Sequence, residues 1–271
     1  MFKFLHNIIP PNILLEIGPL TIRYYGLFLM LAILAAIFIT IRISKWYKIK
    51  KDIILDLSIY LIIGGILGAR IYDVFLELPY YLNNPQQIIQ VWKGGLAIHG
   101  GLMGGFLALL FFIQKYKLSL IKITAIIIPG VALGQSIGRW GNWFNQELFG
   151  LPSKLAFAIP IDLINRPIAY INETHFHPTF LYESVACFFL ACLLFYLHWR
   201  WHKKITHKQE KIIISLYLSI YAFIRFMLEF IKVDYTPIFL NLRWPQFTSL
   251  LMLVLSIVIL FYTDKSKINN N

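Results

Sequence analysis

The chain alternates between long apolar runs and short polar connections along nearly its whole length. A helix needs about 20 mostly apolar residues to cross the hydrocarbon core of a bilayer, and seven runs come close to or exceed that length. These predicted spans are Tyr24–Ile43, Ile53–Leu76, Leu96–Ile113, Ile123–Phe144, Pro178–Leu197, Ile212–Ile231 and Phe247–Tyr262. The runs are continuous, which favours helices over the alternating strands of a membrane barrel. The pattern predicts an all-α integral membrane protein with seven transmembrane helices.

The composition agrees with a membrane protein and disfavours several other classes. Hydrophobic residues make up 58% of the 271 positions and charged residues only 14%, whereas ordinary globular chains are about 45–50% apolar and about 25% charged. A soluble enzyme, a disordered protein and a secreted disulfide scaffold are therefore disfavoured. We predict a single membrane domain over 1–271. Its longest connection, 145–177, is predicted to form a small extracytoplasmic cap between spans four and five.

The formal net charge of +12 is explained by how the basic residues are distributed among the loops. With the N-terminus outside and the C-terminus inside, the inside loops carry about twice as many Lys and Arg residues as the outside segments, as the positive-inside rule expects. The last of these inside residues are Lys265 and Lys267. Nucleic acid is not needed to account for the charge. The basic inside loops should also attract anionic lipid head groups of the bilayer.

Glycines recur at four-residue spacing in the second, third and fourth predicted spans. Examples are Gly64 with Gly68 in span two and Gly100 with Gly104 in span three. Small residues at this spacing let helix backbones approach closely in lipid. The glycines therefore predict tight contacts between these helices.

Six of the predicted spans place polar groups in their outer halves, whereas the inner halves are nearly bare. Ionisable groups at membrane depth are costly, so each is a candidate for function. Three arginines and a histidine at the level of the lipid head groups suit an anionic phosphate, because arginine stays charged and offers a planar fork of donors. The candidate site residues are Tyr25, Arg70, His99, Arg139, Asn142, Glu147, His177, Tyr182, Glu183, Tyr221, Arg225 and Glu229.

These residues alone leave alternatives open. Arg70 with Asp73, and Arg225 with Glu229, could be ion pairs that only hold helices together, and His99 could be bonded to a backbone carbonyl. Three classes of protein remain: a lipid enzyme, a transporter of a lipid or small anion, and a non-enzymatic scaffold. A transporter needs access from both faces and often shows a repeat with broken helices near the midplane, whereas this sequence shows no repeat and its polar cluster is one-sided. A scaffold leaves the arginines unexplained, and the histidines near the cap lack the coherent ligand set that a metal needs.

Six motifs, read in order, resemble the phosphatidylglycerol–prolipoprotein diacylglyceryl transferase family of the bacterial inner membrane. The segment around Arg139, which reads Gly-Arg-Trp-Gly-Asn-Trp-Phe-Asn-Gln-Glu, is the most specific of them. The motifs occupy residues 22–27, 68–70, 92–101, 138–147, 177–183 and 221–230. The resemblance covers essentially the whole chain, and the seven-helix architecture and outward-facing site of that family agree with the predicted topology.

The resemblance implies a reaction and its partners. The diacylglyceryl group of phosphatidylglycerol would move to the thiol of the lipobox cysteine in a prolipoprotein signal peptide. A thioether forms, glycerol phosphate leaves, and no cofactor or metal is implied. The enzyme would be a multi-pass protein of the bacterial inner membrane with its active site toward the outer, periplasmic face.

Roles for the candidate residues follow from the chemistry of that reaction. We expect Arg139 and Arg225 to hold the phosphate, because preorganised cations stabilise developing charge. The nucleophile is the thiolate, so His99 is a candidate general base, with hydrogen bonding alone as its alternative role. We predict that Asn142, Glu147 and Glu229 orient the arginines. We predict that Tyr25 and Tyr221 bound the head group. The predicted supporting residues are Arg70, His177, Tyr182 and Glu183.

The chain departs from the family pattern at two positions. Lys232 stands where the family often has arginine, which keeps the charge but loses a bidentate fork. Ala125 stands where some members carry an acid at the inner start of the fourth span. That position is far from the outer cluster, so we expect little effect on the chemistry.

Overall fold

The computed structural model describes residues 2–18 and 20–261, which form two compact units. The first unit takes the described residues up to 40 and those from 125 onward, and the second takes residues 41–124. Lys265, Lys267 and the last residue of the seventh predicted span, Tyr262, lie outside the described residues.

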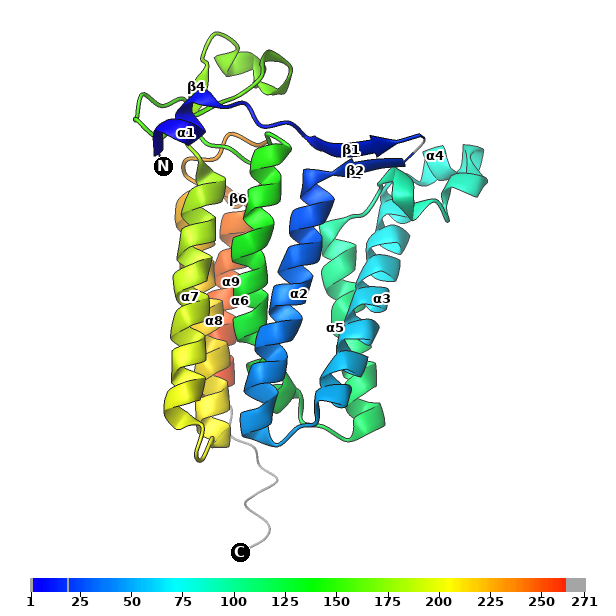
Figure 1. Cartoon of the computed structure of the whole chain (residues 1–271), viewed down its shortest axis with the longest axis vertical. Coiled ribbons are helices and arrows are strands. Elements are labelled where there is room, and N and C mark those ends of the chain that lie inside the picture. The colour runs from blue at the N-terminus through cyan, green and yellow to red at the C-terminus, as the bar shows by residue number, and fades with distance from the viewer. Residues whose placement is uncertain (1, 19, 262–271) are drawn as a thin grey trace, which may run out of the picture. The chain divides into compact units, whose positions relative to one another are not determined.

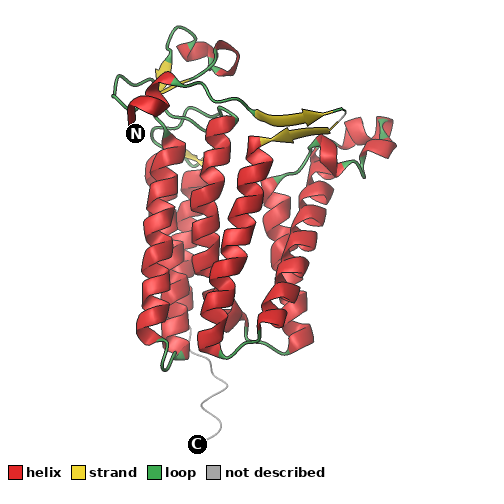
Figure 2. Cartoon of the chain, in the orientation of Figure 1, coloured by secondary structure: helices red, strands yellow, loops and turns green. Residues whose placement is uncertain are grey.

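Seven helices in the described part of the chain are long and apolar enough to cross a membrane, which confirms the seven predicted spans (Figure 1; Figure 2). They are α2 (Tyr24–Ser44), α3 (Lys51–Leu76), α5 (Ile98–Tyr116), α6 (Leu120–Phe144), α7 (Thr179–Trp201), α8 (His207–Leu228) and α9 (Trp244–Phe261). Their ends differ from the prediction by a few residues. The largest difference is at the start of α8, where Thr206 caps the helix in a reciprocal pair with Gln209, a polar signal that hydropathy does not register.

The first unit is a bundle in which α2, α6, α7, α8 and α9 run side by side (Figure 1). A Cβ atom added at Gly130 of α6 would lie 2.5 Å from the Ala36 carbonyl oxygen and 2.8 Å from Thr40 Oγ1 of α2. Only glycine allows that approach. Near the cap end of the same two helices, Tyr24 of α2 stacks on Phe144 of α6 with ring centroids 4.2 Å apart. The glycine therefore packs helices closely, as its spacing predicts, but its partner is α2, the first predicted span, and not the second or third.

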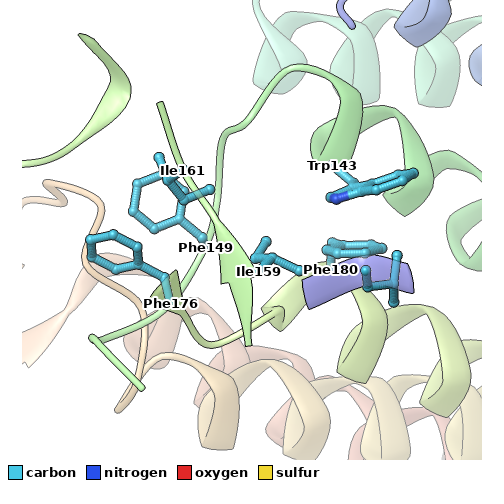
Figure 3. Packing of buried hydrophobic residues seen from close by; sticks show 7 residues of the cluster. Trp143, Phe149, Ile159, Ile161, Phe176 and Phe180 are labelled. Carbon is cyan, nitrogen blue, oxygen red and sulfur yellow. The ribbon is translucent and has the colours of Figure 1, made fainter. Parts of the chain in front are cut away.

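The segment between α6 and α7 folds over one end of the bundle with the short helix α1 (Phe2–Asn7). Its strands β3 (Ile159–Pro160) and β4 (His175–Phe176) pair antiparallel, and the 3-10 helices η4 (Leu163–Asn165) and η5 (Ile168–Tyr170) lie between them. Its apolar cluster is shown in Figure 3 and consists of Leu5, Trp143, Phe149, Ile159, Ile161, Phe176 and Phe180. Because Trp143 belongs to α6 and Phe180 to α7, this cluster joins the cap to the ends of the two helices that carry much of the candidate site.

Two further hairpins belong to the first unit. The strands β1 (Ile13–Ile17) and β2 (Leu20–Arg23) lead into α2, and β5 (Ile238–Phe239) and β6 (Leu242–Arg243) lead into α9. The turn of the second hairpin places Leu240 and Asn241 at φ of 50° and 59°, the left-handed pair that a tight two-residue hairpin turn requires.

The second unit is built on α3 and α5, which lie against each other through their glycines. A Cβ atom added at Gly68 would lie 2.7 Å from the Cα of Gly104, and one added at Gly64 would lie 2.9 Å from the Gly104 carbonyl oxygen. The predicted contact between these two helices is therefore confirmed. The remaining elements of this unit are α4 (Leu78–Asn83) and the 3-10 helices η1 (Lys45–Tyr47), η2 (Pro85–Gln87) and η3 (Val91–Lys93).

Candidate functional site

A chain of polar side chains joins α6, the loop that follows it and α7 within the first unit. Arg139 of α6 donates from Nη2 to Glu183 Oε1 of α7 at 2.6 Å and from Nη1 to Asn142 Oδ1 at 3.2 Å. Asn142 in turn donates from Nδ2 to Glu147 Oε1 at 2.7 Å. Arg139 and Asn142 are three residues apart, so they share one face of the helix. The carboxylate of Glu183 and the amide of Asn142 fix the guanidinium from two sides.

The backbone around Glu147 is held in an uncommon conformation. Gln146 and Leu148, on either side of Glu147, have φ of 52° and 55°, which costs of order 1–3 kcal/mol at each non-glycine residue. Gln146 is anchored to the middle of the cap segment, because its side chain donates to Asp162 Oδ2 and accepts from the Asp162 backbone N–H, both at 2.7 Å. The cap therefore fixes the turn that presents Glu147 to Asn142.

Glu183 is the central acid of the site. Its side chain is only 1% exposed, and it accepts from Tyr221 of α8 at 3.3 Å as well as from Arg139. Its second oxygen lies 3.5 Å from Lys232 Nζ. Buried carboxylates need such compensation, because desolvation of an isolated charge is costly. We define the Glu183 group as Arg139, Glu183, Tyr221 and Lys232.

A second acid, Glu229, lies at the C-terminal end of α8 and binds two cations there. Its carboxylate lies 3.1 Å from Arg225 Nη2 and 3.1 Å from Arg243 Nε. Arg243 also donates from Nη1 to the carbonyl oxygens of Glu229 at 2.9 Å and Lys232 at 2.6 Å, and from Nη2 to that of Asp234. One guanidinium thus folds the segment after α8 back onto Glu229. We define the Glu229 group as Arg225, Glu229 and Arg243.

Taken together, these two groups place four cations against two carboxylates. The Nη1 atom of Arg225 is buried and has no hydrogen-bond partner among the described residues. A buried donor without a partner carries a desolvation cost, which an anionic ligand would remove. The arrangement is therefore suited to bind a phosphate-bearing molecule.

Burial and neighbouring charges shift the pKa of the Lys232 ammonium. Its side chain is 2% exposed, and burial lowers the pKa of its ammonium from 10.5 to about 8, although the nearby Glu183 acts in the opposite direction. The neighbouring Asp234 has a raised pKa, first because of burial. The positive charge of the site therefore depends on pH in the alkaline range.

Tyr25 belongs to the same unit and lies against α6. A Cβ atom added at Gly141 would lie 2.9 Å from Cδ2 of the Tyr25 ring, so this glycine makes room for the tyrosine. Its side chain remains substantially exposed. An exposed phenol beside the Arg139 turn of α6 is placed where it can bound a head-group site.

Polar contacts beneath the site hold the helices that carry it. Ser184 Oγ of α7 donates to the Ser136 carbonyl oxygen of α6 at 2.7 Å and accepts from Trp140 Nε1 at 3.2 Å. Tyr217 of α8 donates to Gln135 Oε1 of α6 at 3.1 Å. These bonds fix α7 and α8 relative to α6.

His177 and Tyr182 lie together at the start of α7. His177 Nδ1 and the Tyr182 hydroxyl are 3.0 Å apart. His177 also exchanges backbone hydrogen bonds with the segment just after α6, since its carbonyl oxygen accepts from the Gly150 N–H and its own N–H donates to the Leu151 carbonyl oxygen. These contacts suit the supporting role predicted for both residues.

Arg70, in the second unit, has its donors occupied by backbone. The buried guanidinium donates to the carbonyl oxygens of Gln87, Ile88, Gly94 and Gly95, and it lies 3.7 Å from Asp73. Gly95 has φ of 72°, and a Cβ there would meet the Asp73 carboxylate at 2.6 Å. Arg70 therefore shapes the loop that leads into α5, which favours the structural interpretation of this residue.

His99 lies in the first turn of α5, directly after that loop. Its side chain is exposed, and its ring centroid is 6.3 Å from that of Tyr72 on α3. The loop is tied to α3 by the backbone bond from the Ala97 N–H to the Ala69 carbonyl oxygen, at 3.2 Å. An exposed imidazole on a fixed helix start is accessible for proton transfer or hydrogen bonding.

The sequence analysis did not identify Arg243 as a site residue, and it did not predict that Lys232 would contact Glu183. Arg243 lies 14 residues after Glu229, beyond any helical spacing, and Lys232 was noted only as a departure from a pattern. The available signal was compositional, because both are cations in the otherwise largely apolar segment between α8 and α9. Among the residues that the structure describes, no group of three or more His, Cys, Asp or Glu side chains could hold a metal ion.

Comparison with known proteins identifies relatives along nearly the full chain. The family profile described as prolipoprotein diacylglyceryl transferase matches residues 12–262. A phosphatidylglycerol–prolipoprotein diacylglyceryl transferase from Prochlorococcus marinus is 38% identical over 97% of this chain and 96% of its own length. Proteins of the same name from Synechococcus elongatus and Staphylococcus aureus are each 37% identical, over 92% and 94% of this chain and 86% and 90% of their own lengths.

Proposed function

The chain belongs to the prolipoprotein diacylglyceryl transferase family, and we propose that it transfers the diacylglyceryl group of phosphatidylglycerol to the thiol of a prolipoprotein cysteine. This is the first step of lipoprotein maturation. A carbon–sulfur bond forms between the cysteine Sγ and the terminal glycerol carbon of the diacylglyceryl group. The bond between that carbon and the phosphate oxygen breaks, and glycerol phosphate leaves with the bonding electrons.

The observation that carries the mechanism is the pairing of four cations with two buried carboxylates at the cap end of the first unit. We assign the phosphate to Arg139 and Arg225. The unpartnered Nη1 of Arg225 supports this assignment, because it is a donor available to a phosphate oxygen. Both guanidinium groups are held in advance by carboxylates, so little reorganisation is needed when negative charge develops on the leaving phosphate.

The remaining residues of the first unit orient that clamp. Glu183 and Asn142 fix Arg139, and Glu147 fixes Asn142. Glu229 fixes Arg225. Tyr221, which donates to Glu183, and Tyr25 bound the head group. Lys232 adds a third cation through Glu183, although it lacks the bidentate fork of arginine.

The thiol must lose its proton to react, because the thiolate is the nucleophile. We assign the acceptor role to His99, because histidine is the side chain that most often acts as a general base in enzymes. Its exposure in the first turn of α5 supports access by a peptide thiol. Hydrogen bonding to the substrate is the alternative role, and a pH–rate profile that lacks a histidine limb would favour it.

The protein is a multi-pass membrane protein, and its relatives are bacterial. We propose that it resides in the inner membrane with the candidate site toward the outer face, and that the acceptor is the lipobox of a prolipoprotein signal peptide. The one-sided distribution of basic loops supports that orientation.

The direct test uses the purified full-length protein with phosphatidylglycerol and a lipobox peptide. We expect the peptide to gain the mass of a diacylglyceryl group and to lose that gain when its cysteine is replaced by serine. A folded protein that produces no gain in anionic lipid would contradict the proposal and favour a transporter, whose substrate gate would then be the cluster of cations.

A further inference from the structure

An apolar groove runs along the face where α3 meets α5 in the second unit. Its volume is about 720 Å³. The backbone of Gly64, Gly68 and Gly104 forms part of the lining, where the two helices approach too closely for any side chain. Walls on either side are formed by bulky apolar residues such as Leu67 and Leu107, which are 57% and 63% exposed. The glycines that pack the helices therefore also leave a channel between two exposed rows of side chains.

The groove is long and has almost no polar surface. On α3 its lining residues extend from Ile59 to Phe75, a helical rise of about 24 Å at about 1.5 Å per residue. That length covers most of the hydrocarbon thickness of about 30 Å. An acyl chain lying in it would meet only carbon along nearly all of its path.

One end of the groove carries a fixed cation. Tyr60 lines the groove, and its hydroxyl accepts from the exposed Lys115 Nζ at 2.8 Å. The ammonium also lies 5.4 Å and 5.7 Å from the ring centroids of Tyr60 and Tyr116, within the range of cation–π attraction. The nearby Asp56 is engaged by the Tyr116 hydroxyl at 2.8 Å. By the positive-inside prediction, this end faces the cytoplasm.

We propose that this groove is a binding site for an anionic glycerophospholipid, with an acyl chain along α3 and α5 and the phosphate on Lys115. Charge complementarity selects this occupant. Lysine binds phosphate as a point charge, whereas the positively charged n-region of a signal peptide would meet repulsion from the same ammonium. The site is separate from the cation clusters of the first unit and does not depend on the proposed transfer reaction.

Native mass spectrometry of the full-length protein tests the head-group contact. The protein is incubated with equal amounts of phosphatidylglycerol and phosphatidylcholine that carry identical acyl chains. The amount of each lipid that stays bound to the protein after collisional activation is then measured. We expect Lys115→Gln to lower the retention of phosphatidylglycerol relative to phosphatidylcholine at least fivefold. Lys51→Gln is the matched control, because this exposed lysine begins α3 and does not line the groove. Lipid bound at the first unit is present in both variants and cancels from the comparison.

A photoreactive residue in place of Leu107 tests the acyl-chain contact separately. We expect it to form an adduct with phosphatidylglycerol, and we expect Lys115→Gln to reduce the yield of that adduct. The proposal is overturned if Lys115→Gln retains the lipid preference of the wild type. It is equally overturned if the photoreactive residue is captured mainly by a lipobox peptide when both ligands are present. Because catalysis is not measured, neither result affects the proposed function.

Discussion

At the scale of single residues, Glu183 joins two cations that come from different parts of the first unit. We predict that Glu183→Gln lowers transfer activity at least tenfold, because Arg139 and Lys232 would keep their charges without a carboxylate between them. Breaking a buried pair in this way costs about 3–5 kcal/mol, so the midpoint of thermal unfolding should fall as well. Activity is read from the peptide mass and stability from a thermal melt in detergent.

The control for that variant is Glu173→Gln, which makes the same chemical change at an exposed position of the cap. It should leave activity and the melting midpoint unchanged. If Glu183→Gln retains activity within twofold of the wild type, the orientation of Arg139 does not depend on this carboxylate.

Lys232 gives the site a pH dependence that an arginine would not have. Burial lowers the pKa of its ammonium from 10.5 to about 8, so the folded protein loses this charge as the pH rises through about 8, where an ordinary lysine is still protonated. We predict that the KM for phosphatidylglycerol rises several-fold from pH 7 to pH 9.5 in the wild type. In Lys232→Arg it should stay nearly constant, because arginine remains protonated. The ratio of the KM values of the two proteins at each pH removes the effect of the peptide thiol, which ionises in the same pH range.

Raising the pH should change the stability of the protein and its binding of phosphatidylglycerol in opposite directions. Between the folded and unfolded pKa values of Lys232, the unfolded chain binds more protons, so the free energy of unfolding should increase with pH through this window. Parallel KM profiles for the wild type and Lys232→Arg would show that this lysine does not contribute charge to the substrate site.

Spacing predicted the contacts that lie within one helix turn. Arg139 with Asn142, and Arg225 with Glu229, are pairs at i,i+3 and i,i+4, so helical geometry alone brings them together. The contacts that complete the site cross between elements. Glu183 meets Lys232, and Glu229 meets Arg243, only because the segment after α8 folds back. No periodicity in the sequence encodes that turn.

At the scale of elements, the α3–α5 contact permits a matched comparison of two adjacent glycines. A Cβ added at Gly104 would meet the Gly64 carbonyl oxygen and would lie 2.8 Å from the Cα of Gly68, whereas one added at Gly105 would have nothing within 4 Å. We predict that Gly104→Ala lowers the thermal midpoint, because the helices must separate. Gly105→Ala should be neutral or slightly stabilising, since alanine is favoured over glycine by about 1 kcal/mol in a helix.

Thermal unfolding of the two variants in the same detergent measures the difference. Equal midpoints would mean that α3 and α5 are not held together through their glycines. The same pair also bears on the lipid groove, because Gly104→Ala would disturb its floor, whereas Gly105 is not among the residues that line it.

The long elements were predictable and the short ones were not. A continuous apolar run predicts each transmembrane helix, because a segment in lipid must pair its backbone groups internally as a helix. The hairpins β1–β2 and β5–β6 carry no comparable signal. The strands β5 and β6 have two residues each, and their turn uses Leu240 and Asn241 in left-handed conformation instead of the glycine that usually marks such a turn.

At the scale of the whole molecule, the proposed function requires the candidate site to face away from the cytoplasm. The cap lies at one end of the first unit and the turn between α7 and α8 at the other (Figure 1), because α7 extends for 23 residues and so spans about 35 Å. We predict that a cysteine replacing Asn172, an exposed cap residue, is labelled by an impermeant maleimide in intact cells. A cysteine replacing Lys204, an exposed residue of that turn, should react only after the membrane is opened.

The two native cysteines allow this experiment with one further change. Cys187 is buried, and Cys192, which is exposed on α7, is replaced by alanine to remove background. Labelling at Asn172 but not at Lys204 would support an outward site, reached by a peptide whose cysteine has crossed the membrane. The reverse pattern would place the cap and the cations of the candidate site on the cytoplasmic side of the membrane. It would therefore contradict the positive-inside assignment. The glycerol phosphate product would then be released into the cytoplasm, and the acceptor thiol would have to react before export, so this single labelling pattern decides the order of the two events.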